Sequence, residues 1–171
     1  MLKPYQQRIL CLDIRPRSFA FVVFEGPKVV LDWGARSFRR GVNAVRVPLG
    51  LKVARLLHEY APCALVLERP RTSKHLRIVA AIRKQAKTHK IPIRLLSART
   101  IDAVFSGSND NKDQIASVLT TRFPDLLSVL PPKRKPWQSE DYRMSIFDAA
   151  ALGTAYFERK HRPDPTLPQP Q

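Results

Sequence analysis

The sequence is short of acidic residues. Only 14 Asp and Glu residues face 30 Lys and Arg residues, which gives the 171-residue chain a net charge of +16 at neutral pH. A surface this basic attracts polyanions at physiological salt. Nucleic acid is the first expected partner, because neutralising its phosphates supplies most non-specific binding. An anionic membrane surface is the second, and a basic surface that merely faces solvent is the simplest alternative.

Long apolar runs and metal-binding clusters are also missing. No apolar run is long enough to span a membrane, and the N-terminus lacks the apolar core of a signal peptide. We therefore predict a cytoplasmic protein with no membrane partner. The two cysteines, Cys11 and Cys63, lie in apolar segments and are predicted to be buried thiols in a reducing compartment. No Cys/His cluster has the spacing of zinc ligands.

The apolar pattern changes between strand and helix periods along the chain. Short apolar segments bounded by turn residues predict strands, and apolar residues three and four apart predict helices. Three successive strands with tight turns predict an antiparallel meander, and two later strand–helix crossovers add parallel strands. We therefore predict an α/β fold with a five-stranded mixed sheet flanked by helices. The expected strands are 8–14, 19–24, 28–34, 63–68 and 91–96, and the expected helices are 47–60, 75–89, 98–105, 112–123 and 142–160.

The length and composition predict a single folded unit. A chain of 171 residues suits one domain, and we assign it to residues 1–162. Residues 163–171 contain four prolines and are predicted to form a flexible tail.

Three carboxylates occupy positions where an isolated charge would be costly. Asp13 and Glu68 each end an apolar strand, and Asp148 lies within an apolar helical stretch. An ionised carboxylate survives burial only with a cation, hydrogen-bond donors or a metal ion. A shared Mg²⁺ (or Mn²⁺) ion would suit all three, because these ions prefer oxygen ligands. A separate salt bridge for each acid is the alternative, with Arg15, Arg69 and Arg143 as the nearby partners.

Several segments resemble the RuvC-type Holliday junction resolvases, a family within the ribonuclease H-like superfamily. Residues 9–24 are similar to the family's opening hairpin, in which an Asp closes the first strand. Residues 64–68 are similar to the strand that carries its catalytic Glu. Residues 108–116 resemble its polar loop and Lys-containing helix start, and 147–152 resemble its closing helix. The matches occur in this order over residues 8 to 157.

The resemblance implies a fold, an activity and a site. It implies a ribonuclease H-like domain acting as a metal-dependent, structure-specific endonuclease on branched nucleic acid, expected to be branched DNA in recombination or repair. Asp13, Glu68 and Asp148 would be catalytic and would hold Mg²⁺ or Mn²⁺, and Lys112 would lie near the scissile phosphate. Two coordinated incisions also imply a homodimer.

Two departures from the family pattern leave other functions open. The family usually has a fourth acid one helical turn before its last Asp, where this chain has Ser145. Asp141 is a possible substitute if the helix extends that far, and Glu140 is a more distant one. The turn after Asp13 carries Arg15 and Arg17 instead of small residues. The alternatives are an inactive nucleic-acid-binding module, a YqgF-like nuclease for structured RNA, and an unrelated α/β binding protein.

Positive charge is concentrated beside these carboxylates. Residues 69–101 contain ten Lys and Arg and no Asp or Glu, directly after Glu68. Trp137 follows a second basic cluster and could stack on a base, although packing within its loop is the simpler explanation. Contacts to phosphate would give affinity without sequence reading. The residues expected to bind nucleic acid are Arg15, Arg17, Arg69, Arg71, Lys74, Arg77, Lys112, Lys133, Arg134 and Lys135.

Overall fold

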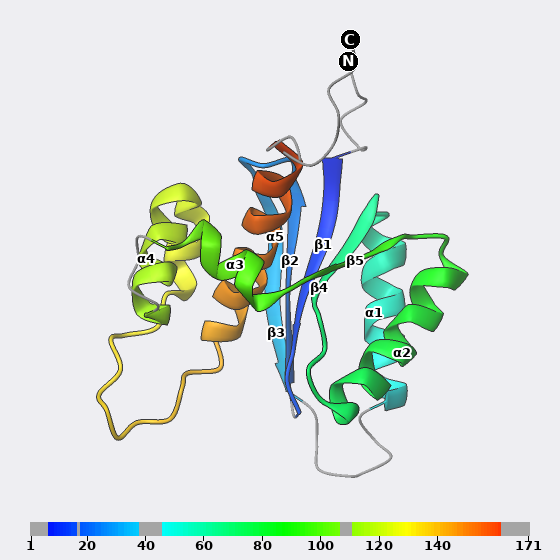
Figure 1. The fold of residues 1–171 in the computed structure, drawn as a ribbon, viewed down its shortest axis with the longest axis horizontal. Helices are drawn as coiled ribbons and strands as arrows, with labels where there is room; N and C mark the ends of the chain where they lie inside the picture. Colours follow the sequence, from blue (N-terminus) through cyan, green and yellow to red (C-terminus); the bar gives the residue numbers. More distant parts are fainter. Residues whose placement is uncertain (1–6, 17, 38–45, 107–110, 162–171) are drawn as a thin grey trace.

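The protein folds into a central sheet with helices on both faces (Figure 1). The computed structural model describes residues 7–16, 18–37, 46–106 and 111–161. The strands are β1 (Arg8–Ile14), β2 (Ser18–Glu25), β3 (Val30–Ser37), β4 (Ala64–Glu68) and β5 (Ile93–Leu96). The helices are α1 (Arg46–Tyr60), α2 (Ser73–Thr88), α3 (Ala98–Val104), α4 (Lys112–Arg122), the 3₁₀ helix η2 (Pro124–Val129) and α5 (Met144–His161).

The sheet has the mixed topology that the sequence predicts. Its strand order is β3-β2-β1-β4-β5. β1, β2 and β3 form an antiparallel meander, and β4 and β5 continue the sheet in parallel with β1. β5 lies at one edge and begins directly after Pro92, as expected for a residue without an N–H to donate. Because β1 and β4 are parallel neighbours, their carboxyl ends lie side by side at the same end of the sheet.

Alternating residues of each strand bury against different helices. Leu10 and Leu12 of β1 pack into the core shared with α1 and α2. Ile9 and Cys11 pack into the second core, formed with α4, η2 and α5 on the opposite face. Because side chains alternate along a strand, Asp13 projects toward the α5 side. The strand pattern thus directs the acid at the end of β1 to the helix that carries Asp148.

The structure corrects some predicted details. α5 begins at Met144 rather than Tyr142, so Asp141 precedes the helix and does not share a helical face with Asp148. Cys11 is buried as predicted, but Cys63 is only partly buried. In the described residues, no helix is both long and apolar enough to cross a membrane. The predicted 163–171 tail lies outside the described residues, and the single-domain assignment stays a prediction.

A close contact fixes α5 against β2. A Cβ atom built at Gly153 of α5 would lie 2.1 Å from Cε2 of Phe24. Phe24 is fully buried and packs edge-to-face with Phe123 and Phe157, at centroid distances of 5.4 and 6.1 Å. The ring is therefore held between neighbouring aromatic side chains and could move only by displacing them. α5 can approach the sheet this closely only because residue 153 has no side chain.

We expect Gly153→Ala to lower the free energy of unfolding by about 2 kcal/mol, as overpacking of a dense core does. Urea denaturation followed by circular dichroism would measure the change. Gly50→Ala in α1 is the matched control, because its Cβ would lie 3.6 Å from the nearest atom, an ordinary contact. The control should be neutral or slightly stabilising, since alanine favours helix. Equal stability of the two variants would contradict this account of the α5 packing.

Candidate functional site

Two of the predicted acids meet at the end of β1. Asp13 leaves the strand on the α5 side, and Ser145 in the first turn of α5 donates a hydrogen bond of 2.8 Å from Oγ to Asp13 Oδ2. Asp148 lies one helical turn after Ser145, on the same face of α5. The helix therefore brings Asp148 to the carboxylate of Asp13, although 135 residues separate the two in the chain (148 − 13).

A single guanidinium group lies among the carboxylates. Arg15 donates from Nε to Asp13 Oδ2 at 2.9 Å and from Nη2 to Asp148 Oδ2 at 2.6 Å. Its Nη1 atom lies 2.7 Å from Glu140 Oε1. The side chain of Arg15 is 27% exposed, so the three ion pairs are partly shielded from water. Arg15 thus bridges acids from β1, α5 and the loop before α5, and is the shared cation of the site.

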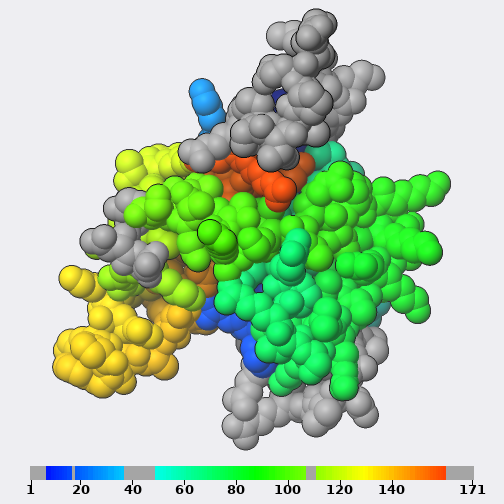
Figure 2. Space-filling model, in the orientation of Figure 1, coloured from blue at the N-terminus to red at the C-terminus, as the bar shows by residue number. Residues whose placement is uncertain are grey.

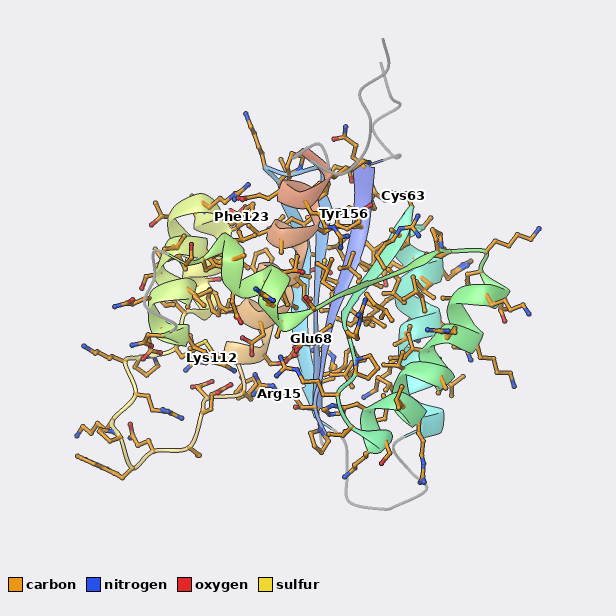
Figure 3. The ribbon with its side chains drawn as sticks, viewed as in Figure 1. Arg15, Cys63, Glu68, Lys112, Phe123 and Tyr156 are labelled. Atoms are coloured by element: carbon orange, nitrogen blue, oxygen red, sulfur yellow. The ribbon has the colours of Figure 1, made fainter. Side chains whose placement is uncertain are left out.

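Lys112 adds a second cation from α4. Its Nζ atom lies 3.0 Å from Asp148 Oδ2 and 3.3 Å from Glu140 Oε2. Figure 3 shows Arg15 and Lys112 near each other in the lower half of the view, where both bond Asp148. We call Asp13, Arg15, Lys112, Glu140 and Asp148 the carboxylate cluster. Its three acids and two bases leave a formal charge of −1 (−3 + 2).

The charges of the cluster perturb one another. Burial raises the pKa of Asp148, the charge of Asp13 raises it further, and Lys112 and Arg15 only partly oppose this. Burial also acts to raise the pKa of Glu140, but its bonds to Arg15 and Lys112 outweigh this and lower it. Burial would lower the pKa of Arg15, yet Asp13 and the other acids raise it above its ordinary value. The guanidinium therefore stays charged and holds the acids together.

Glu68 lies beside the cluster but faces another partner. Leu12 of β1 pairs with Leu67 of β4, so Asp13 and Glu68 follow on neighbouring strands. Both line a pocket of about 400 Å³ at the carboxyl ends of these strands. The exposed carboxylate of Glu68 accepts a hydrogen bond of 2.8 Å from Nη2 of Arg71. The structure thus brings Glu68 next to Asp13 without joining it to Arg15.

The fit of these carboxylates to a divalent metal ion depends on the side chains around them. The carboxylates are of the type that Mg²⁺ prefers. As the side chains stand, however, no group of three or more His, Cys, Asp or Glu in the described residues is placed to hold a metal. Arg15 lies between Asp13 and Asp148, and Glu68 is turned to Arg71. While Arg15 stands between Asp13 and Asp148, the cluster does not fit a metal ion, although the carboxylates themselves suit one if the guanidinium moves away.

The remaining predicted site residues lie in separate places. Asp141 bonds Arg143 through both carboxylate oxygens, at 2.8 to 3.0 Å, and takes no part in the cluster. Arg17 lies outside the described residues. The alternative of one arginine per acid is wrong for Asp13 and Asp148, which share Arg15. Glu68 pairs with Arg71 rather than with the suggested Arg69.

Exposed basic residues flank the cluster on two sides. Arg69 and Arg71 follow β4, and Lys74 and Arg77 lie on the first turns of α2. On the other side, Lys133, Arg134 and Lys135 lie on the exposed loop between η2 and α5. This loop forms the yellow projection at the lower left of the space-filling view (Figure 2). A polyanion crossing the carboxyl edge of the sheet would therefore meet positive charge on both sides of the acids.

Two members of the carboxylate cluster, Glu140 and Arg15, are only weakly indicated by the sequence. Glu140 lies in a loop without periodicity, so its distance from Asp148 could not be inferred from spacing. In the sequence, Arg15 is a departure from a small-residue turn, one possible salt-bridge partner and one of the residues expected to bind nucleic acid. Its bridging position depends on where α5 and the loop before it come together. A strand-end acid followed two residues later by arginine is the only signal in the sequence.

Comparison with known proteins places this fold. No family model matches the chain, and no curated protein matches its sequence. Among solved structures, RuvC of Thermus thermophilus in complex with a Holliday junction substrate matches with a TM-score of 0.66 at 13% identity, covering 91% of this chain and 96% of that one. The yeast mitochondrial Holliday junction resolvase Ydc2 has a TM-score of 0.64 at 12% identity, covering 93% and 83%. The fowlpox virus resolvase, solved with Holliday junction DNA, has a TM-score of 0.59 at 16% identity, covering 91% and 99%.

The fold class follows from the sheet and these likenesses. The three antiparallel strands, two parallel strands and flanking helices are a ribonuclease H-like α/β fold. Within that class, the structural likeness extends over about nine-tenths of the chain to the RuvC-type Holliday junction resolvases. The predicted fold and family resemblance are both confirmed at the level of structure.

Proposed function

We propose that this chain is a metal-dependent, structure-selective endonuclease that acts on branched nucleic acid. The main support is the convergence of Asp13 and Asp148 at the end of β1, with Lys112 bonded to the same cluster. Active sites of α/β proteins gather at the carboxyl ends of strands. The resolvase likenesses supply the substrate class, because two of those proteins were solved with Holliday junctions. A homodimer, with one site per incision, belongs to the same proposal.

In this proposal each residue has a defined part. Asp13, Glu68 and Asp148 would be the catalytic carboxylates and would hold Mg²⁺ or Mn²⁺, an ion that would supply Lewis-acid chemistry for phosphodiester hydrolysis. Lys112, half-exposed beside Asp148, is placed to contact a phosphate oxygen. Ser145 positions Asp13 through its hydrogen bond. A metal ion can reach Asp13 and Asp148 only if Arg15 leaves the cluster, because its guanidinium occupies the space between them.

Binding without cleavage is the second candidate, and Arg15 is the observation that favours it. Its fixed positive charge, together with that of Lys112, offsets most of the negative charge of the cluster, so the folded state does not need a metal ion there. Under this alternative the basic flanks bind branched nucleic acid and the acids only stabilise the fold. A branched RNA could occupy the same surface as branched DNA, because phosphate contacts do not distinguish the two.

A panel of substrates tests the proposal. Holliday junctions, flaps, plain duplex, single-stranded DNA and structured RNA would be incubated with the full chain in Mg²⁺, in Mn²⁺ and in chelator. Cleavage of junctions or flaps only with a metal ion supports the endonuclease. Tight binding of the same substrates without cleavage in either metal selects the binding module. Preferential cleavage of structured RNA would instead support the YqgF-like alternative.

We also expect the affinity for branched DNA to fall more than about a hundredfold between 50 and 200 mM salt, as about four phosphate contacts would require. Fluorescence anisotropy of a labelled junction in chelator would measure it. The exposed basic side chains of Lys74, Arg77 and Lys133 are placed to make such contacts. Affinity that stays flat across this range would contradict a phosphate-binding surface.

A further inference from the structure

An exposed indole stands next to the carboxylate cluster. Trp137, in the loop between η2 and α5, is 79% exposed. Packing within its own loop was the simpler explanation of this residue, but an indole so exposed contributes little to any core. The loop nevertheless holds it in a defined turn. Gln138 N–H donates to the Lys135 carbonyl at 3.0 Å, and Lys135 N–H donates to the Gln138 side-chain oxygen at 3.1 Å.

The surroundings of Trp137 match the chemistry of a nucleotide. Its ring lines a pocket of about 1000 Å³ together with Arg134 and Tyr142, which is itself 68% exposed. The ammonium of Lys135 lies 5.6 Å from the indole centroid. Within the described part of the chain, Lys133, Arg134 and Lys135 form no salt bridge with an acid. Aromatic faces bordered by unpaired positive charge bind a base and its phosphate together.

Two of the three acids of this pocket are paired and therefore oppose such a ligand little. Glu140 is paired with Arg15 and Lys112, and Asp141 with Arg143, while Asp113 lies in the first turn of α4. Lys112 and Glu140 belong both to the pocket and to the carboxylate cluster. The pocket therefore opens onto the proposed cleavage site, and a strand held in it would lead directly to the acids. Fully paired duplex keeps its bases stacked inside, so only an unpaired nucleotide could present a base here.

We propose that this pocket is a subsite for an unpaired nucleotide at a branch point, in which a base stacks on Trp137 and its phosphate contacts Arg134. The inference rests on the proposed nucleic-acid function and adds to it the feature of the substrate that is recognised. It gives the protein a means of preferring branched over continuous duplex that does not depend on cleavage.

The test uses the full chain in chelator, so that no substrate is cut. The sequence has two tryptophans, Trp33 and Trp137, so Trp33→Phe leaves Trp137 as the only indole. If Trp33→Phe folds poorly, the fluorescence of Trp137 is obtained instead by subtracting the fluorescence of Trp137→Phe from that of wild type. Flapped DNA with unpaired nucleotides should quench Trp137 fluorescence. Continuous duplex should not quench it when the same fraction of the protein is bound, as measured by fluorescence anisotropy. Removing the base of the unpaired nucleotides at the flap junction should abolish the quenching.

Trp137→Ala should bind the flapped DNA roughly tenfold more weakly, as expected for the loss of one base–aromatic stack. Its affinity for continuous duplex should stay within about twofold of wild type, because phosphate contacts are unchanged. Equal quenching by duplex and flap, or unchanged flap affinity of Trp137→Ala, would overturn the subsite while leaving nucleic-acid binding intact. Absence of binding to every DNA and RNA tested would overturn both proposals.

Discussion

Asp13→Asn should reduce metal-dependent cleavage of branched nucleic acid by roughly a hundredfold to a thousandfold, the scale on which loss of a charge-stabilising group acts in a catalytic site. The substitution keeps the shape of the side chain but removes its negative charge. Ser145 and Arg15 both bond Asp13 Oδ2, and the amide oxygen of asparagine can still accept from them. The fold should therefore survive while the metal site loses a ligand. Single-turnover cleavage of a labelled junction measures the effect.

Asp141→Asn is the matched control for this experiment. Asp141 lies in the segment just before α5, yet its carboxylate pairs with Arg143 and lies outside the cluster. Its substitution should change the cleavage rate less than about tenfold, as a partly exposed pair away from the cluster contributes little. Cleavage by Asp13→Asn at the wild-type rate would remove Asp13 from the proposed site. Loss of cleavage in both variants to the same extent would mean that the loop, rather than the cluster, controls the reaction.

Arg15→Ala should raise the affinity for Mn²⁺ by at least about tenfold, equivalent to about 1.4 kcal/mol. The reason is competition, because Arg15 neutralises the oxygens of Asp13 and Asp148 that a metal ion would bind. Without metal, the free energy of unfolding of the variant should be about 2 kcal/mol lower than that of wild type. That is less than the loss of a fully buried pair, because Arg15 is partly exposed. Isothermal titration calorimetry and metal-dependent thermal melting measure the two effects without any assay of activity.

Arg122→Ala provides the comparison, because Arg122 pairs with Glu158 away from the cluster. Its metal affinity should equal that of wild type. The Mn²⁺ affinity of Arg15→Lys should lie between those of wild type and Arg15→Ala, since an ammonium keeps the charge but cannot reach three carboxylates in the same geometry. If Arg15→Ala bound Mn²⁺ no better than wild type, Arg15 would not be a competitor for the site. The binding-only function would then be the better explanation of the cluster.

The sequence predicted the architecture because strands and their order leave strong local signals. Buried strands such as β4 are short, apolar and bounded by turns, and the tight turn before β2 predicted the meander. The sequence also predicted the meeting of Asp13 and Asp148, because each acid lies in or at the end of an apolar segment and both segments resemble parts of the resolvase family. The strand signals come from local pattern within a single element, whereas the meeting of the acids also required the resemblance.

The composition of the cluster could not be predicted in the same way. Glu140 enters it from an irregular loop, and the partners of Arg15 depend on the relative placement of β1, that loop and α5. The helix start mattered as well, because α5 begins two residues later than expected and leaves Asp141 outside. Side-chain pairing across elements is decided by tertiary geometry, which the hydrophobic pattern does not encode. Exposure of Trp137 likewise followed from the loop conformation rather than from its neighbours in sequence.

The tight seating of α5 on Phe24 limits how the site can change. Ser145 and Asp148 are carried by a helix that has no spare space beneath residue 153, and Asp13 belongs to the central strand of the sheet. The separation of the two aspartates is therefore set by rigid backbone before any ligand arrives. The groups that can adjust to a ligand are therefore the guanidinium of Arg15 and the loop that carries Glu140. Ligand-free and ligand-bound forms should accordingly superpose over β1 and α5 and differ at the arginine.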